Sequence, residues 1–184
     1  MKIPDQAKRV FKGVIFDVYQ WEQEMFDGSK ATFEMMKRPG TTQVIATVGD
    51  KIFMAHESQP TKPDFFSLPG GRLEEGEEPL AGAKRELLEE SGLESDDWEL
   101  YKMYEPVHKL DWQVHAYIAR NCRKVAEPKL DSGEKIAIEA MDFDKFVATV
   151  LFSKFWGDTF VMDILRMKLD PEKLEEFRIK LFSV

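Results

Sequence analysis

Three glutamates at helical spacing are the residues best suited to do chemistry in this 184-residue chain. Residues 78–91 have a helix-forming composition, with a proline in the first turn and Gly92 where a helix end favours left-handed backbone. At 3.6 residues per turn, Glu86, Glu89 and Glu90 lie on one face, where like charges repel unless a cation lies between them. Mg²⁺ and Mn²⁺ prefer carboxylate oxygens, and a phosphate can complete their shell. The spacing predicts a cation site for a phosphate compound or, as the simpler alternative, a solvated acidic helix.

The negative charge of the chain is concentrated around these glutamates. The formal net charge is −8, and residues 71–97 carry ten acidic and three basic side chains, which is −7 and leaves −1 for the rest. Nucleic-acid binding needs a basic stripe, so this balance predicts no nucleic-acid partner. A polyanionic substrate would approach the acidic face only with metal ions in place.

The glutamates belong to a longer pattern. Residues 71–93 read GRLEEGEEPLAGAKRELLEESGL and fit GX5EX7REUXEEXGU, with U a hydrophobic residue, at every position. The fixed residues are Gly71, Glu77, Arg85, Glu86, Glu89, Glu90 and Gly92. If each has about a one-in-ten chance at ordinary composition, all seven coincide on the order of once in ten million placements. The chain therefore resembles the Nudix hydrolase superfamily, which disfavours the solvated-helix alternative.

The resemblance implies a metal site and a set of structural residues. It implies two or three Mg²⁺ or Mn²⁺ ions, held by the Gly70 backbone carbonyl and the carboxylates of Glu86, Glu89 and Glu90. It gives structural roles to Gly71, Glu77, Arg85 and Gly92. Arg85 is expected to pair with nearby carboxylates and to orient them.

The resemblance also implies a catalytic base that removes a proton from the attacking water. We call residues 71–93 the Nudix box. A carboxylate on a loop outside this box is typical of the related pyrophosphatases, and Glu134 is our first choice. Asp131 is the second choice, and Glu86 acting from within the box is the third. The simpler alternative for Glu134 is a solvent-exposed loop acid.

Outside the box, the chain is most similar to the ADP-ribose and ADP-sugar pyrophosphatases. The similarity lies in an extra antiparallel strand pair before the core and in the acidic loop at 130–136. It implies hydrolysis of the pyrophosphate bond of a nucleoside diphosphate sugar such as ADP-ribose, giving a nucleoside monophosphate and a sugar phosphate. The chain departs from the group at Ser67, where members usually carry a glutamate, and this bears on metal count and substrate choice.

Two other functions remain open. The first is a Nudix pyrophosphatase for (d)NTPs or dinucleoside polyphosphates, which does not need the extra strand pair. The second is a non-catalytic ligand sensor on the same fold, but such domains usually lose box carboxylates and all are present here.

Two residues before the box are candidates for substrate binding. Arg38 can complement a phosphate or ribose, and the ring of Trp21 can stack on a purine base. A tryptophan on an amphipathic strand also fits a core or subunit interface. The long apolar strand predicted at 11–26 would expose a pairing edge, so we expect a homodimer that covers it.

The predicted elements alternate between strands and helices, which is typical of an α/β fold. We expect strands at 11–26, 31–37, 42–48, 51–56, 98–104, 113–119 and 135–139, a loop at 58–66, and helices at 78–91, 143–149, 156–167 and after Asp170. The expected fold is a Nudix α/β/α sandwich with a mixed sheet and an additional N-terminal antiparallel strand pair. One domain spans 1–184, with the strand pair at about 11–38, the box at 71–93 and C-terminal helices at about 143–182.

Two further features bear on location. No apolar segment is long enough to span a bilayer, so no membrane association is expected. The single cysteine, Cys122, cannot form an internal disulfide, so we expect a reducing cytoplasm.

Overall fold

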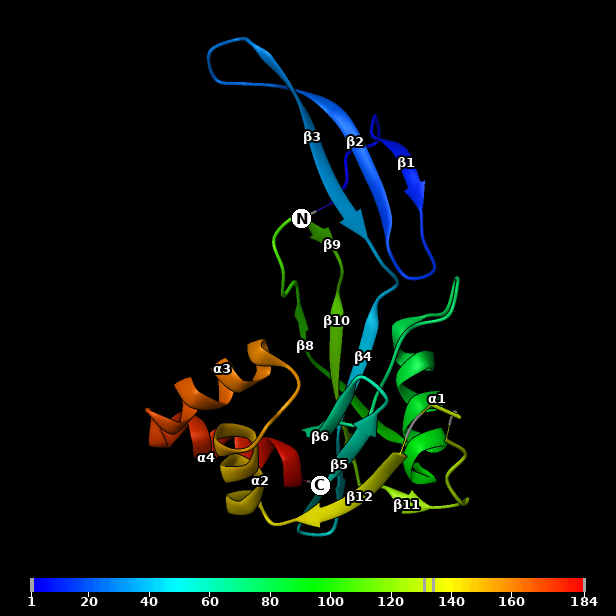
Figure 1. Cartoon of the computed structure of the whole chain (residues 1–184). Helices are drawn as coiled ribbons and strands as arrows, with labels where there is room; N and C mark the ends of the chain where they lie inside the picture. The colour runs from blue at the N-terminus through cyan, green and yellow to red at the C-terminus, as the bar shows by residue number, and fades with distance from the viewer. Residues whose placement is uncertain (1, 131, 134, 184) are drawn as a thin grey trace.

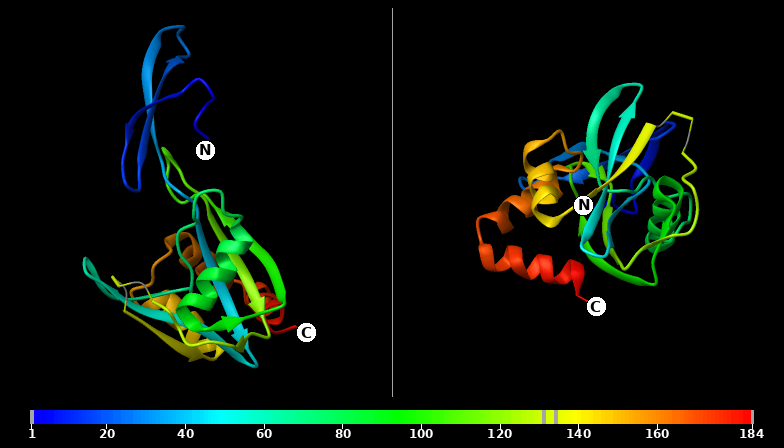
Figure 2. Two further views of the ribbon diagram at one scale, coloured as in Figure 1. Left: turned by 90° about the vertical axis from the view of Figure 1, so that its right-hand side faces the viewer. Right: turned by 90° about the horizontal axis from the view of Figure 1, so that it is seen from below.

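A central sheet between two layers of helices organises the protein. The structure is a computed structural model that describes residues 2–130, 132–133 and 135–183. Helix α1 (Pro79–Ser91) covers one face of the sheet, and α2 (Phe143–Phe152), α3 (Asp158–Lys168) and α4 (Pro171–Phe182) cover the other (Figures 1 and 2). This arrangement confirms the α/β/α sandwich expected from the sequence.

The central sheet is mixed, as expected. Its strands run in the order β12-β5-β4-β10-β8, with β6 paired to β5. Their bounds are β4 Thr41–Val48, β5 Lys51–Gln59, β6 Lys62–Ser67, β8 Asp97–Tyr104, β10 Val114–Arg120 and β12 Lys135–Met141. Strands β4 and β10 are parallel, and the other pairs are antiparallel. The parallel pair lies at the centre, where both faces are covered.

A second sheet is formed by the N-terminal strands and projects from the sandwich (Figure 1). Its order is β1-β2-β3-β9, with bounds β1 Lys8–Lys12, β2 Asp17–Glu24, β3 Lys30–Lys37 and β9 Leu110–Asp111. The expected strand pair is present as β2 and β3, joined at the Asp27-Gly28 turn, where Gly28 has φ 82°. The single strand expected at 11–26 is wrong. The chain reverses between Lys12 and Asp17, so β1 adds a third N-terminal strand.

The segment 58–66 was expected to be a loop because it holds two prolines, and this is also wrong. Residues Lys62–Ser67 form β6, which pairs with β5 and meets Phe155 through a single bridge. A proline lacks the N–H that a central strand needs, but an edge strand tolerates it. The remaining strands, β7 (Leu93–Glu94) and β11 (Arg123–Lys124), pair with each other.

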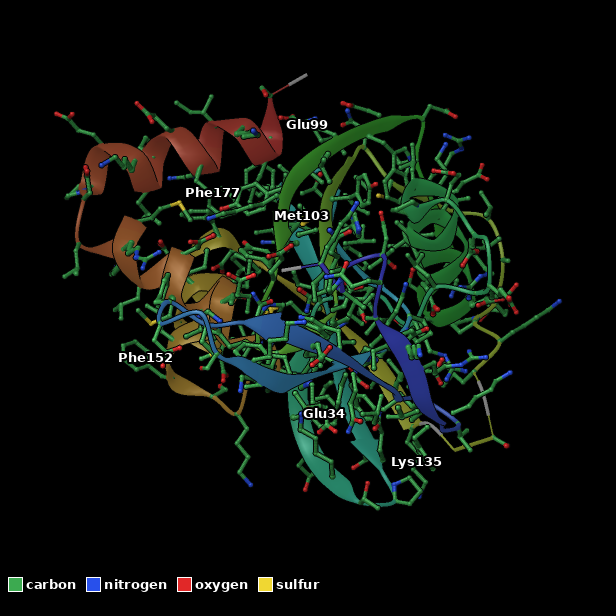
Figure 3. All side chains as sticks on the ribbon, turned by 90° about the horizontal axis from the view of Figure 1, so that it is seen from above. Glu34, Glu99, Met103, Lys135, Phe152 and Phe177 are labelled. Atoms are coloured by element: carbon green, nitrogen blue, oxygen red, sulfur yellow. The ribbon has the colours of Figure 1, made fainter. Side chains whose placement is uncertain are left out.

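Alternation along β4 divides the core into two clusters. Val44 and Ala46 face α1, while Ile45 between them packs with the residues of α2, α3 and α4. Phe177 on α4 is buried in the core, and in Figure 3 it lies on the side of α4 that faces the rest of the molecule. Among the described residues, no helix is long and apolar enough to cross a membrane.

Candidate active site

Helix α1 positions the box glutamates through a buried face that borders theirs and includes Glu90 itself. Ala83 and Leu87 are fully buried against β4 and β10, which fixes the rotation of the helix about its axis. The helix ends at Gly92, which has φ 70° and donates its N–H to the Leu88 carbonyl at 2.8 Å. A side chain at Gly92 would also collide with the Ala126 carbonyl. The predicted structural role of Gly92 is consistent with this geometry.

Arg85 is the centre of an ion-pair network that joins the loop to the helix. Its guanidinium donates to both carboxylate oxygens of Glu77, at 2.9 and 3.0 Å, and to Glu86 and Glu89 at 2.9 Å each. These acceptors raise the pKa of Arg85, and the Arg85 hydrogen bonds hold the pKa of Glu77 below its usual range. Arg85 therefore orients the carboxylates, as the sequence predicted, and Glu77 anchors it.

The segment Pro69–Gly71 lies against the start of β4 and close to the helix. The Pro69 carbonyl accepts from Val44 and the Gly71 carbonyl accepts from Thr42, both at 2.8 Å. Gly70 has φ 147°, and a Cβ there would collide with the Thr42 carbonyl, so only glycine fits. Among the described residues, the Gly70 carbonyl accepts no backbone hydrogen bond. It is therefore available to a ligand.

The donor set at this point fits a hard divalent cation. Glu90 is 7% exposed and accepts the Gly70 N–H at 2.9 Å, and the Glu86 carboxylate lies so close to Gly71 that a Cβ there would be 2.5 Å from its oxygen. All the donors are carboxylate or carbonyl oxygens, which Mg²⁺ and Mn²⁺ prefer. Within the described part of the chain, no three acidic, histidine or cysteine side chains already converge on one point. A bound cation would have to compete with Arg85 for Glu86 and Glu89.

Two adjoining cavities open over these residues. Both are lined by Gly70, Gly71, Glu90, Arg38, Arg72 and Gln59. The larger, about 500 Å³, also contains the carboxylates of Glu86 and Glu89, and the smaller, about 250 Å³, contains Glu57 and Ser67. The predicted metal ligands Gly70, Glu86, Glu89 and Glu90 therefore meet the predicted substrate-binding residue Arg38 here.

Glu57 supplies a carboxylate at the point where the sequence departs from the related pyrophosphatases. Ser67 on β6 takes the place of the group's usual glutamate, and its hydroxyl donates to the Glu57 carboxylate on the neighbouring strand β5. Gln59 also donates to Glu57, at 3.4 Å. Burial raises the pKa of Glu57, partly offset by these bonds and by Lys62. Glu57 was not predicted from the sequence because its placement depends on the register between β5 and β6.

Two arginines line both cavities together with the carboxylates. Arg38 stacks on Trp112, with 4.6 Å from its guanidinium carbon to the ring centroid, and its Nε is buried without a hydrogen-bond partner. Burial and the neighbouring charge of Arg72 lower the pKa of Arg38. Within the described residues, neither guanidinium is paired with a carboxylate. Arg72, which the sequence analysis missed, follows the first glycine of the box directly and so was identifiable by position.

Trp21 is not brought to these cavities within one chain. It lies on β2 in the N-terminal sheet, donates from its indole nitrogen to Gln23 at 3.1 Å, and contacts Phe33 with ring centroids 5.9 Å apart. The proposed bases, Glu134 and Asp131, lie outside the described residues. The segment just before them is tethered to the box helix, because the Lys129 N–H donates to the Glu89 carbonyl at 2.7 Å.

Comparison with known proteins agrees with this geometry. Residues 36–159 match the model of the NUDIX domain, and the chain belongs to the Nudix hydrolase family. It is a Nudix pyrophosphatase, a class that typically uses divalent metal ions and nucleotide-type substrates.

Individual proteins are also similar to this chain. The chain is 30% identical to the ADP-ribose pyrophosphatase of Bacillus subtilis (strain 168) over 138 residues, 73% of this chain and 74% of that protein. It is 25% identical to the methanol dehydrogenase activator of Bacillus methanolicus over 168 residues, 89% and 91% of the two chains. Among solved structures, an ADP compounds hydrolase has the same fold, with a TM-score of 0.71 at 17% identity over 91% of this chain and 94% of that one.

Proposed function

We propose that this Nudix pyrophosphatase hydrolyses the pyrophosphate bond of a nucleoside diphosphate sugar such as ADP-ribose. The products would be a nucleoside monophosphate and a sugar phosphate. The relative named ADP-ribose pyrophosphatase supports this substrate class, as does the N-terminal sheet that the sequence analysis associated with that group.

The observation that carries the proposal is that arginines and carboxylates line one cavity. Arg38 and Arg72 line the cavity of about 500 Å³ together with the carboxylates of Glu86, Glu89 and Glu90. A diphosphate placed between them would contact the arginines on one side and metal ions on the other. Guanidinium groups bind phosphate oxygens in this way, and metal ions bridge phosphate oxygens to carboxylates.

The residues would divide the work between binding and proton transfer. Gly70, Glu86, Glu89 and Glu90 would hold two or three Mg²⁺ or Mn²⁺ ions. When bound, such ions neutralise phosphate oxygens and make water easier to deprotonate. Arg38 and Arg72 would orient the diphosphate, and Glu134, with Asp131 and Glu86 as alternatives, would accept the proton of the attacking water.

We also propose that the active form is a homodimer assembled through the N-terminal sheet in the cytoplasm. Strand β1 is an unpaired edge, and its side chains Val10 and Phe11 are exposed. A second subunit would cover this edge and these side chains. The buried, single Cys122, whose pKa is raised by burial to about 11, suits a reducing compartment.

A substrate panel tests the proposed reaction. Purified protein with Mg²⁺ is given ADP-ribose, ADP-glucose, GDP-mannose, dinucleoside polyphosphates and dNTPs, and the products are identified by mass. We expect AMP and ribose 5-phosphate from ADP-ribose at the highest kcat/KM. Cleavage of dNTPs without action on the nucleotide sugars would instead favour the triphosphate pyrophosphatase alternative.

The same assay tests the base. Glu134→Gln should lower kcat about 10²–10⁴-fold, the usual loss for a general base, with little change in substrate affinity. The acidic limb of the pH profile should disappear in this variant. Near-full turnover in Glu134→Gln together with loss of turnover in Glu86→Gln would place the base in the box.

A further inference from the structure

The turn between β1 and β2 belongs to the N-terminal sheet but reaches the candidate active site. Residues 13–16 form it, and the Gly13 N–H donates to the Phe16 carbonyl at 3.0 Å. In Figure 1 this turn lies at the end of the N-terminal sheet that is nearest to the sandwich. Ile15 in the turn lines the cavity of about 500 Å³ together with Glu86 and the other box carboxylates. The N-terminal sheet therefore contributes to the wall of this cavity within one chain.

The composition of this turn is unusual for an exposed position. Exposed turns are usually built from glycine, proline, asparagine, aspartate or serine. Here Val14, Ile15 and Phe16 follow Gly13, and they are 98%, 43% and 37% exposed. A side chain at Gly13 would collide with the Phe16 carbonyl, so the turn is tight. Burial in the core of one chain does not account for these apolar residues, and the contact that Phe16 makes indicates another role.

Two aromatic rings lie against the guanidinium of Arg38. Its central carbon is 5.7 Å from the centroid of the Phe16 ring and 4.6 Å from that of Trp112. Both distances are within the range of about 6 Å over which a cation is attracted to the face of a ring. Among the described residues, the Arg38 Nε is buried without a hydrogen-bond partner. The contacts that hold this side chain are therefore largely contacts with aromatic faces.

Arg38 and Arg85 are held in opposite ways. Arg85 donates to the carboxylates of Glu77, Glu86 and Glu89, so its N–H groups are used within the protein. A ring contacts the planar face of a guanidinium, whereas the N–H donors point outward in its plane. Stacking can therefore fix the position of Arg38 without using these donors. Such a guanidinium keeps its N–H groups for an oxyanion in the cavity.

The two rings come from different regions of the molecule. Trp112 belongs to the sandwich, because it packs against the main core and its indole N–H donates to the Thr41 hydroxyl at 3.0 Å. Thr41 begins β4 and is only 4% exposed, so this hydrogen bond fixes the ring to a central strand. Phe16 belongs to the N-terminal sheet. Arg38 therefore lies where the two regions meet, in contact with both.

We propose that Phe16 and Trp112 are positioning residues for diphosphate binding, which hold the Arg38 guanidinium against their rings and leave its N–H groups to the diphosphate. This inference rests on the proposed function, which places Arg38 at the diphosphate. Because Phe16 lies in the turn between β1 and β2, the N-terminal sheet then supports substrate binding within one chain, in addition to its proposed role in assembly.

The affinity for a diphosphate that cannot be hydrolysed tests the inference. Methylenediphosphonate is titrated into the full chain with Mg²⁺ and followed by calorimetry. Phe16→Leu removes the ring and should weaken binding about 2- to 5-fold, as for loss of one partly exposed cation–π contact. Phe16→Tyr keeps a ring and should bind as the wild type does. Trp112→Phe, which leaves a weaker ring without the indole N–H, should also weaken binding about 2- to 5-fold.

A double-mutant cycle distinguishes positioning of Arg38 from a merely structural role. In an Arg38→Gln background there is no guanidinium to hold, so Phe16→Leu and Trp112→Phe should weaken binding no further. Phe26→Leu, at the exposed hairpin tip of the same sheet, is the control and should bind as the wild type does. Wild-type affinity in Phe16→Leu would overturn the inference. So would an equal loss in Phe16→Tyr or Phe26→Leu, or a loss that persists in Arg38→Gln.

The result is separable from the proposed reaction. If wild-type protein hydrolyses ADP-ribose, Phe16→Leu should raise KM with kcat unchanged, because only uniform binding is lost. Hydrolysis of ADP-ribose by wild-type protein, combined with no effect of Phe16→Leu on diphosphonate binding, would overturn the positioning role alone. An effect of Phe16→Leu that depends on Arg38, combined with no hydrolysis of ADP-ribose, would support the positioning role and overturn the proposed substrate.

Discussion

The N-terminal sheet and the central sandwich use apolar residues in opposite ways. In the sandwich, Ile45, Phe146 and Phe160 are fully buried between the sheet and the helices. In the N-terminal sheet, Phe11 is 59% exposed and the Phe26 side chain at the hairpin tip is fully exposed. The sandwich completes its own core, whereas the N-terminal sheet presents apolar surface that a single chain leaves uncovered. The candidate active site lies in the sandwich, and we assign assembly to the N-terminal sheet.

The largest effect is expected from the charge of Glu90 in the sandwich. Glu90→Gln keeps the shape of the side chain but removes a metal-ligand charge, so kcat should fall by several orders of magnitude. The melting temperature in EDTA should stay the same or rise slightly, because one of three repelling carboxylates is gone. Steady-state kinetics with Mg²⁺ measure kcat, and calorimetry measures the affinity for Mn²⁺. Glu176→Gln, on the exposed face of α4, is the control, and wild-type rates in Glu90→Gln would remove Glu90 from the metal site.

The assembly role of the N-terminal sheet is tested by mass in solution. Light scattering at micromolar concentration should give twice the chain mass of 21.4 kDa for the wild type. Phe11→Asp should give the single-chain mass, since a charge on β1 opposes burial against a second copy. Val125→Asp, which alters an exposed apolar residue outside the N-terminal sheet, should stay dimeric. A monomeric wild type would contradict the proposed assembly.

A moderate effect is expected at Glu57, where function and stability should change in opposite directions. Glu57→Gln should lower kcat/KM about 10- to 100-fold, as for loss of a group that supports a metal site. Replacing Ser67 with glutamate in the same variant should restore part of the activity, because the carboxylate returns from the neighbouring strand. Equal activity in Glu57→Gln and wild type would make Glu57 structural.

The stability of the same variant depends on pH. Burial raises the pKa of Glu57 above its ordinary value of 4.5, so the native state favours the protonated acid. The resulting stability is present below the unfolded pKa and is lost as pH rises through the folded pKa. In metal-free buffer, Glu57→Gln should therefore melt higher than wild type at pH 7, and the difference should shrink towards pH 4. A constant difference across this range would argue against the raised pKa.

The smallest effect is expected from a helix cap in the sandwich. The Asp142 carboxylate accepts the Lys145 N–H at 2.8 Å at the start of α2. Asp142→Ala should cost about 1 kcal/mol of unfolding free energy, typical for loss of an N-cap, and leave kinetics unchanged. Urea unfolding measures it, with Asp144→Ala, two residues further along in the first turn, as the comparison. A loss of activity in Asp142→Ala would contradict the prediction, because it would mean that α2 affects the active site.

Local patterns in the sequence were enough to predict the helix and the tight turns. The box, Gly92 and the Asp27-Gly28 turn are each specified by neighbouring residues, and the structure has them where expected. Pairing between distant strands was not predictable in this way. Strand β6 was missed because a proline such as Pro63 is tolerated only at a sheet edge, and edge position depends on the whole sheet.

The same limit applies to the site. The spacing of Glu86, Glu89 and Glu90 is visible in a helix, but the meeting of Glu57 with Ser67 requires the register of β5 against β6. The metal-binding candidates could therefore be predicted from the sequence, whereas Glu57 beside them was found only in the structure.

The connection between β3 and β4, one of the segments that join the two regions, consists of Arg38, Pro39 and Gly40. Hydrogen bonds fix both ends, from the Arg38 N–H to the Asp111 carbonyl and from the Thr41 N–H to the Gln113 carbonyl. A Cβ at Gly40 would lie 2.9 Å from a side-chain carbon of Leu73 in the box, so this connection is closely packed. The exposed turn at Asp27-Gly28 could accommodate inserted residues, whereas we expect insertions between β3 and β4 to disrupt these contacts. The length of this connection therefore helps to set how far the N-terminal strands stand from the candidate active site.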